Sequence, residues 1–363
     1  MDALIVLALN SGSSSLKFGL YRRTASIVEA LLQGETASTD RGVATILRSI
    51  AETGLPAPTA VGHRIVHGGP GRRDHYLIDD ETLSEIERGG AFAPLHVADV
   101  LETIAEARSA FPHVPHVACL DTAFHKDLPK HARTLPLDAA LTAGVERYGF
   151  HGLSCASIVH QFSETVPSRL IVAHLGSGAS VTAIRDGRSI DTSMGMTPTG
   201  GMMMATRSGD LDPGVLLFLM RERGFGPAEL ENLLDRRSGL LGISGISSDP
   251  RELHVLAAVK PAARLAIAMF ATAGAKQIAT MMVSLSGADA LVFTGGVGEH
   301  DSAMRAMIVE RLSWAGLTID PKLNAASIGR VEAEDSRVQI HVLPANEQEE
   351  IVRSVIALVA QLS

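Results

Sequence analysis

The hydrophobic pattern near the start of the chain recurs in its middle. In residues 4–21 two apolar segments flank a short Ser/Gly turn, which predicts a β-hairpin with a polar tip. Residues 170–184 repeat the pattern after a shift of 166 positions. The shift aligns Leu4, Ile5, Val6, Leu9, Ser11, Gly12 and Ser14 with the identical residues Leu170, Ile171, Val172, Leu175, Ser177, Gly178 and Ser180. We therefore predict two related α/β domains that face each other across a shared cleft.

Three later segments also have patterns of buried elements. Residues 290–294 are apolar and lead into a glycine loop, followed by a helix that begins near Ser302. Residues 265–285 are apolar, but Gly274, Lys276 and Gln277 interrupt them, so they predict a core helix and not a membrane span. Residues 351–362 have apolar side chains at helical spacing and predict a closing helix that covers a sheet.

Composition and charge narrow the class of protein. A chain of 363 residues exceeds the usual size of one hydrophobic core, which agrees with two domains. The formal net charge of -8 repels a phosphate backbone, so nucleic acid is not expected as a partner. The only cysteines, Cys119 and Cys155, indicate a reducing compartment. The apolar start has neither a basic leader nor a small-residue cleavage site, so we expect a cytoplasmic protein that does not enter a membrane.

The two hairpin tips have the chemistry of phosphate-binding loops. Gly and Ser put no bulk in the way of an anion, and their backbone N–H groups and Ser hydroxyls donate to it. The alternative is that each tip is only a tight turn. Competing signatures are absent, because the sequence contains neither a Gly-Lys dipeptide for a Walker loop nor GxGxxG, GxSxG or HExxH.

Two arginines stand in uncharged surroundings. No charged residue occurs from 192 to 206, and Arg207 follows directly. A guanidinium in such a loop is costly to desolvate unless it meets an anion, so Arg207 is a candidate anion ligand, the alternative being a solvated surface arginine. Arg64 lies in an apolar, strand-like run. Arg64 is likewise a candidate anion ligand, the alternative being that it forms an internal salt bridge.

Three further side chains are candidates for the site. Asp121 ends the apolar run HVACL, at the strand end where open α/β sheets collect ligands, or else it caps a helix. His151 lies in a loop between glycines, although most histidines of a chain are structural. Glu347 follows a predicted strand, either as a metal ligand or as an acid in the first turn of a helix.

Together these segments resemble the acetate kinase family of the actin-like superfamily of sugar kinases and chaperone ATPases. The matching motifs occur in order along nearly the whole chain: NSGSSSLK from Asn10, GHRIVHGG from Gly62, DTAFH from Asp121, RYGFHGLS from Arg147, HLGSGAS from His174, DTSMGMTP and MMMATRSGDLDPG between Asp191 and Gly214, and FTGGVGE from Phe293. The resemblance implies an α/β fold of two duplicated actin-like (ribonuclease H-like) domains flanking a nucleotide cleft. It implies an N-terminal domain of residues 1–124 and 349–363, with a returning C-terminal helix, and a nucleotide-binding domain of residues 125–348.

The resemblance also implies roles for individual residues. The residues expected around the transferring phosphoryl group are Arg64, Asp121, His151 and Arg207. Those expected to hold the nucleotide are Ser13, Ser15, Lys17, His174, Leu175, Gly176, Ser177, Gly178, Asp249, Pro250, Arg251, Gly295, Gly296, Val297, Gly298 and Glu299. Arg64, Val66, Leu95, Phe150 and Pro198 are expected to line the acetate pocket, and Asn10 and Glu347 to serve a Mg²⁺ or Mn²⁺ site. Ser177 stands where the family usually has Asn.

The implied activity is reversible, Mg²⁺-dependent transfer of the ATP γ-phosphoryl group to acetate, giving acetyl phosphate and ADP, in a homodimer. Acetate is already ionised at neutral pH, so direct in-line transfer needs no general base. A covalent phospho-Asp121 route stays open. The alternatives are a propionate or butyrate kinase of the same family, and an actin-like ATPase module that turns over ATP without a carboxylate acceptor.

Overall fold

The structure is a computed structural model that describes residues 4–12, 15–24, 27–37, 42–92, 94–327 and 329–361, with the backbone alone at residues 37, 91 and 94–96. The strands of the first half are β1 (Leu4–Ser11), β2 (Ser15–Thr24), β3 (Ile27–Ala37), β4 (Ala60–Ile65), β5 (Tyr76–Leu77) and β6 (His116–Leu120). Those of the second half are β7 (Arg169–Leu175), β8 (Ala179–Arg185), β9 (Arg188–Thr192), β10 (Ala290–Thr294), β11 (Gly329–Arg330) and β12 (Gln339–Val342).

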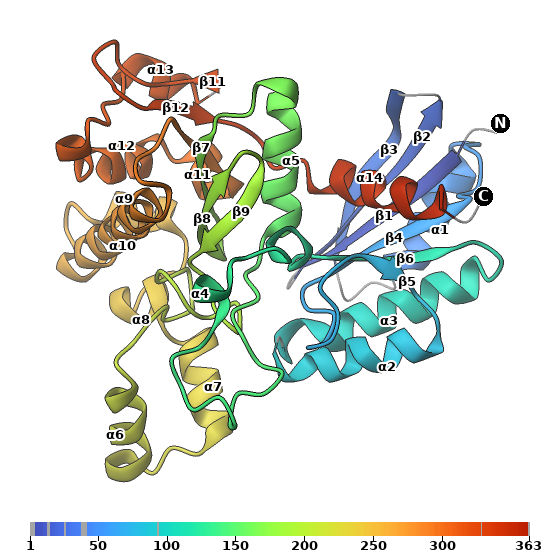
Figure 1. Cartoon of the computed structure of the whole chain (residues 1–363), viewed down its shortest axis with the longest axis horizontal. Helices are drawn as coiled ribbons and strands as arrows, with labels where there is room; N and C mark the ends of the chain where they lie inside the picture. Colours follow the sequence, from blue (N-terminus) through green and yellow to red (C-terminus); the bar gives the residue numbers. More distant parts are fainter. Residues whose placement is uncertain are drawn as a thin grey trace.

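The described strands form two sheets with one shared topology, in separate halves of the molecule (Figure 1). Their orders are β3-β2-β1-β4-β6-β5 and β9-β8-β7-β10-β12-β11. In both, a three-stranded antiparallel meander continues into parallel strands, β1 to β4 to β6 and β7 to β10 to β12. The two predicted hairpins, β1–β2 and β7–β8, and the internal duplication are therefore confirmed.

The helices connect these strands and cover their faces. They are α1 (Gly42–Glu52), α2 (Asp80–Arg88), α3 (Pro94–Ala110), α4 (Lys130–Arg133), α5 (Gly152–Phe162), α6 (Pro213–Arg223), α7 (Pro227–Arg236), α8 (Gly239–Ser244), α9 (Pro250–Leu256), α10 (Pro261–Leu285), α11 (Gly295–His300), α12 (Ser302–Glu310), α13 (Pro321–Ala326) and α14 (Glu347–Val359). The helix predicted near Ser302 is confirmed as α12, which the Asp301 carboxylate caps by accepting from Met304 N at 2.8 Å. The preceding glycine segment was predicted as a loop, which is wrong, because it forms the short helix α11.

Side chains of the central strands alternate between two layers of helices. On one face of the first sheet, Ile5, Leu7 and Leu9 of β1 pack in one core with residues of α1 and α3. On the other face Val6 and Ala8 join residues of α14. The second sheet repeats this arrangement, with alternate β7 residues packing in one core with α10 and in another with α5. This period of two is what a strand covered on both faces requires.

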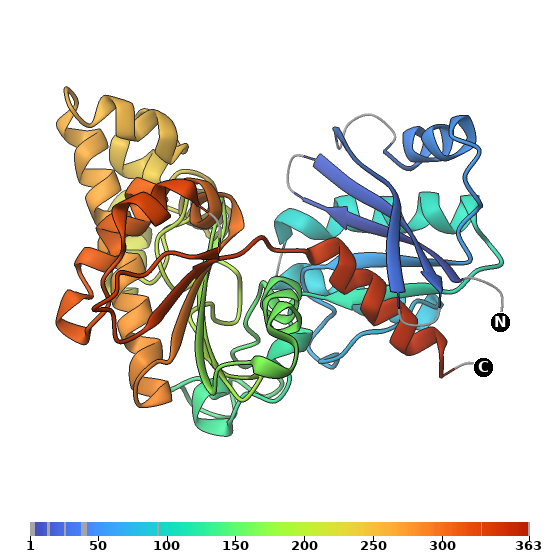
Figure 2. The same ribbon diagram turned by 90° about the horizontal axis from the view of Figure 1, so that it is seen from above.

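Helices α5 and α14 each pack on the sheet of the half that they do not follow in sequence. Helix α5 follows the first sheet in sequence but packs on the second, whereas α14 follows the second sheet and packs on the first. The two helices contact each other where the halves meet (Figures 1 and 2), and His160 Nδ1 of α5 lies 2.7 Å from Glu350 Oε2 of α14. A helix returning to the first sheet is what the predicted division at residues 124 and 348 requires, although the exact boundaries stay a prediction.

Helix α10 is the predicted core helix. Within the described residues it alone is long and apolar enough to cross a membrane by length and composition. It packs against α8, α9, α12 and β8, and its buried side chains, such as Ile267, Phe270 and Ile278, belong to the largest core of the second half. These contacts are those of a core helix.

Candidate active site

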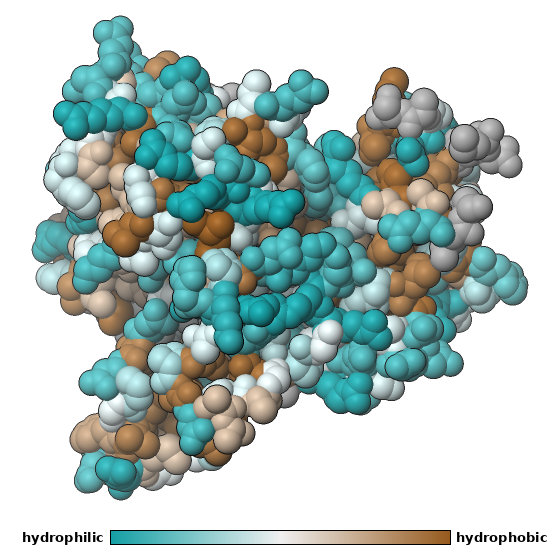
Figure 3. Space-filling view, in the orientation of Figure 1, coloured by the Kyte–Doolittle hydropathy of each residue, from teal (hydrophilic) through white to brown (hydrophobic). Residues whose placement is uncertain are grey.

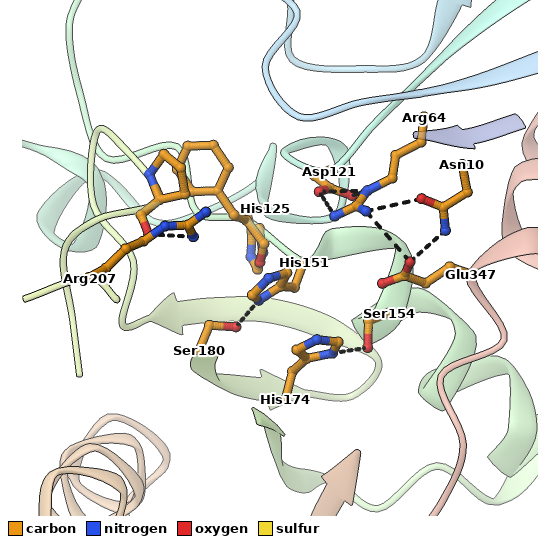
Figure 4. Close-up of polar contacts among 12 residues, drawn as sticks. Asn10, Arg64, Asp121, His125, His151, Ser154, His174, Ser180, Arg207 and Glu347 are labelled. Atoms are coloured by element: carbon orange, nitrogen blue, oxygen red, sulfur yellow. Dashed lines mark hydrogen bonds and ion pairs between the residues drawn. The ribbon is translucent and has the colours of Figure 1, made fainter. Parts of the chain in front are cut away.

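The cleft between the halves contains a cavity of about 510 Å³ into which both sheets direct polar side chains. Its lining residues are Ser11, Gly12, Lys17, Arg64, Val66, Asp121, Phe150, His151, His174, Gly176, Ser177, Gly178, Pro198, Arg207, Gly295, Gly296, Glu299, His300, Ala345 and Glu347. All four residues predicted around the phosphoryl group are among them, so residues far apart in sequence meet in one space (Figure 4).

Arg64 and Asp121 form a buried ion pair on the wall that the first sheet contributes. Arg64 is on β4, and Asp121 directly follows the neighbouring parallel strand β6. The guanidinium donates through Nε at 3.1 Å and Nη2 at 2.7 Å to Asp121 Oδ2, and the two side chains are 16% and 1% exposed. Asp121 therefore does not serve as a helix cap, and the salt bridge considered as the alternative for Arg64 exists within the candidate site.

Two more side chains extend this pair into a polar network. Arg64 Nη1 donates to Asn10 Oδ1 at 3.0 Å, and Asn10 Nδ2 donates to Glu347 Oε2 at 2.9 Å (Figure 4). Burial alone would lower the pKa of Arg64, but the charges of Asp121 and Glu347 raise it overall, so the guanidinium stays protonated. Burial likewise opposes the ionisation of Glu347, yet Arg64 holds the pKa of this carboxyl below its usual value.

The second half contributes His151, His174 and Arg207. His151 precedes α5 with a left-handed φ of 58°, a conformation that non-glycine residues adopt rarely. Its ring stacks on that of His174, with centroids 4.2 Å apart. Desolvation lowers the pKa of each imidazole below its usual value, which favours the neutral ring; for His151 the neighbouring His174, Arg64 and Arg207 add to this effect.

Gly178 lets His151 and Arg207 approach the same point. A Cβ atom on Gly178 would lie 3.2 Å from His151 Nε2 and 3.3 Å from Arg207 Nη1. Arg207 is half-buried and donates through Nη1 to the carbonyl of Pro198 at 3.3 Å. It faces the cavity, which is inconsistent with the alternative of a solvated surface arginine.

A second cavity of about 380 Å³ shares Gly176, Ser177, Gly296 and His300 with the first. Its other lining residues are Ala205, Leu240, Ser248, Asp249, Pro250, Arg251, Val297 and Asp301. Three segments predicted to hold the nucleotide thus converge here. Arg251 pairs with Asp249 at 2.6 Å on the cavity rim and is 84% exposed.

Not every predicted residue lines a cavity. Leu175 and Gly298 are buried and line neither one. Ser15 hydrogen-bonds Glu35 with its hydroxyl. Ser13 lies outside the described residues, as does the side chain of Leu95, whereas Val66, Phe150 and Pro198 line the first cavity together. The assigned roles of all these residues stay predictions.

Some lining residues were not singled out from the sequence. Ser11 and Gly12 belong to the first hairpin tip, and their alignment with Ser177 and Gly178 was the available signal. His300 follows Glu299 directly and lines both cavities, yet one more histidine in a chain of 14 gives no signal.

Comparison with known proteins identifies similar chains along nearly the whole length. The model of the acetokinase family matches residues 29–353. An acetate kinase of Rhodopseudomonas palustris is 39% identical, covering 97% of either chain. A propionate kinase structure from Francisella tularensis superposes with a TM-score of 0.87 at 35% identity, and an acetate kinase structure from Porphyromonas gingivalis with 0.84 at 32% identity. Each covers 98% of this chain and 100% of its own.

Proposed function

The chain belongs to the acetokinase family, and we propose that it is a kinase that reversibly transfers the ATP γ-phosphoryl group to acetate, giving acetyl phosphate and ADP. The observation that carries this proposal is the shared cavity wall of Gly176, Ser177 and Gly296. These residues join the second cavity, where the predicted nucleotide-binding segments converge, to the first cavity, which Arg64, His151 and Arg207 line. A nucleotide and a small acceptor bound in these two spaces would therefore be adjacent.

The residues present suit direct in-line transfer. An acetate carboxylate, with a pKa of about 4 to 5, is ionised at neutral pH, so catalysis consists of positioning and charge neutralisation. Arg64 and Arg207 supply two cations from opposite walls, and His151 supplies a neutral ring nitrogen between them. Asp121 orients Arg64 through its paired hydrogen bonds. This arrangement can stabilise the equatorial oxygens of a phosphoryl group in transit.

Asn10 and Glu347 fit a Mg²⁺ ion bound together with a nucleotide. Their side chains are held within hydrogen-bond distance of each other, and they offer an amide and a carboxylate oxygen. Mg²⁺ typically takes one or two protein oxygens and completes its shell with water and phosphate. When bound, the ion would neutralise charge on the β- and γ-phosphates.

The residues of the predicted acetate pocket that line the first cavity support acetate as the acceptor, and propionate is the second candidate. Val66, Phe150 and Pro198 supply apolar surface beside Arg64 and Arg207. The structural similarity to a propionate kinase favours testing a longer acid. One methylene changes binding in such a pocket by about 1 to 3 kcal/mol, so discrimination between the two acids should be modest.

The activity is tested by trapping acyl phosphate with hydroxylamine in the presence of ATP and Mg²⁺. We expect acetyl hydroxamate to form with the highest kcat/KM, propionyl hydroxamate with a lower one and butyryl hydroxamate with the lowest, and chelation of the metal to abolish all three. ATP hydrolysis without any hydroxamate would contradict the proposal and favour the ATPase alternative. A higher kcat/KM for propionate than for acetate would identify propionate as the preferred acceptor.

A substitution at Ser177 tests the nucleotide site separately. Ser177 lines both cavities with a short hydroxyl where the family usually has an amide. Installing the longer donor and acceptor, Ser177→Asn, should change KM for ATP severalfold and leave KM for acetate nearly unchanged. Kinetics with each substrate varied in turn give the comparison. An effect confined to acetate would contradict the placement of this loop at the nucleotide.

Helix α6 supports the proposal of a homodimer. None of its residues is buried, and its exposed apolar side chains are Val215, Leu217, Phe218 and Met220. Figure 3 shows apolar surface over this projecting helix. Exposed apolar side chains gathered on one helix are typical of a surface that contacts another protein. Sedimentation equilibrium would measure the mass of the assembly, which for a homodimer is twice that of one chain.

The expected cytoplasmic location stays a prediction.

A further inference from the structure

Three histidines around the cleft share one arrangement, in which a serine hydroxyl contacts ring nitrogen Nδ1. The distances from Nδ1 to the serine Oγ are 2.8 Å for His125 with Ser189, 3.0 Å for His151 with Ser180 and 2.8 Å for His174 with Ser154. Figure 4 shows the last two pairs beside Arg64 and Arg207. All three serines are buried, none more than 3% exposed.

The direction of each hydrogen bond decides what the other ring nitrogen offers. A neutral imidazole carries one proton, so a hydroxyl that donates to Nδ1 leaves the proton on Nε2, and a hydroxyl that accepts from Nδ1 leaves a lone pair on Nε2. Only the tautomer with the proton on Nε2 can donate to a phosphoryl oxygen. For His151 the tautomer determines whether Nε2, the ring nitrogen that approaches Gly178 as Arg207 Nη1 does, is a donor or an acceptor.

His125 shows the direction unambiguously. Its Nε2 lies 2.9 Å from the carbonyl oxygen of Phe150, which can only accept, so the proton is on Nε2. The hydroxyl of Ser189 must therefore donate to Nδ1. In this pair the tautomer is fixed by the carbonyl and does not depend on the serine.

Within the part of the chain that the structure describes, no carbonyl oxygen hydrogen-bonds Nε2 of His151, so the hydroxyl of Ser180 determines the tautomer. Ser180 is 1% exposed, and within the described residues the ring of His151 is the one hydrogen-bond partner of its hydroxyl. If Nδ1 donated to Ser180, the hydroxyl proton would be buried without an acceptor, which is costly. We propose that Ser180 is a positioning residue that donates to His151 Nδ1 and so directs a proton on Nε2 toward the transferring phosphoryl group.

The position of Ser180 suits this role. It stands on β8 directly opposite His174 of β7, whose ring stacks on that of His151. Without its hydroxyl, the nearby Arg207 guanidinium would favour the lone pair of Nε2 and thus the opposite tautomer. The proposal rests on the kinase function proposed above, because only that function places a phosphoryl group at this nitrogen.

The tautomer can be measured without turnover. Long-range ¹H–¹⁵N correlation spectra of the full chain labelled at histidine identify which ring nitrogen carries the proton, and the loss of one signal set in His151→Gln assigns His151. We expect the proton on Nε2 in the wild type and a shift toward Nδ1 in Ser180→Ala. A wild-type proton on Nδ1 would overturn the proposal, and this readout does not depend on whether the chain proves to be an acetate kinase.

Kinetics test the consequence with a matched control. Removal of one preorganised donor typically costs about 10²- to 10³-fold in kcat, so Ser180→Ala should lose about 10²-fold with KM for ATP little changed. Ser189→Ala removes the same group from His125, whose tautomer the Phe150 carbonyl maintains, and should stay within about threefold of wild type. Ser180→Thr retains a hydroxyl and should recover part of the rate. Equal losses in the two alanine variants would overturn the proposal.

Discussion

Replacing Arg207 with alanine is expected to lower kcat by at least about three orders of magnitude while KM for ATP changes little. Arginine contacts to a phosphoryl group in transit contribute about 10³- to 10⁵-fold in rate. The structure places Nη1 beside the His151 ring nitrogen and the backbone of Gly178, within the cavity, and the hydrogen bond to the Pro198 carbonyl orients it.

Arg207→Lys is the matched variant. It keeps the charge but loses the planar pair of donors, so it should recover only part of the rate. Thermal melting must show that both variants stay folded. If folded Arg207→Ala kept kcat within about tenfold of wild type while KM for acetate rose sharply, Arg207 would bind the ground-state carboxylate. Arg64 would then take over the transition-state role.

Replacing Asp121 with asparagine should lower kcat by about 10²- to 10³-fold, the loss associated with one preorganised electrostatic contact. The carboxylate accepts from Nε and Nη2 of Arg64, and an amide can present only one oxygen to these donors. Arg64 would then lose its alignment toward the cavity. Initial rates of acetyl hydroxamate formation, with each substrate varied, measure the effect.

A matched control and a chemical trap complete the Asp121 experiment. Asp127 undergoes the same change of charge at an exposed position that lines neither of the two cavities of the candidate site, so Asp127→Asn should leave kcat unchanged. In direct transfer, wild-type protein mixed with labelled ATP and no acetate should retain no label after quenching. Label recovered on the peptide that carries Asp121 would establish the covalent route and exclude direct transfer.

Much of the architecture was predictable because it depends on local pattern. Apolar segments on either side of a Ser/Gly turn predicted the two hairpins, and the identity between residues 4–14 and 170–180 predicted two halves with one topology. The uncharged run before Arg207 marked a guanidinium that lines the cavity. Such signals lie within short stretches of sequence, where the preference of apolar residues for burial, the turn propensity of Ser and Gly and the cost of an unpaired charge act directly.

The glycine segment was predicted less well. Glycine disfavours helix, so residues 295–300 were expected to form a loop, but they form α11. Glu299 of this helix accepts from Gly295 N, and the buried Arg305 donates to the carbonyls of Gly298 and Glu299. Hydrogen bonds supplied by the surrounding structure thus outweigh the low helix propensity.

The sequence by itself determined the duplication, the family resemblance and most residues of the cleft, whereas the tertiary structure decided how these residues pair. Arg64 meets Asp121 across 57 positions, and Asn10 meets Glu347 across 337. Ser180 reaches His151 because β8 pairs with β7, and α5, which His151 directly precedes, packs on the same sheet. Hydrogen bonds depend on distances of about 3 Å and on direction, and for groups so far apart in sequence only the packing of sheets and helices determines both.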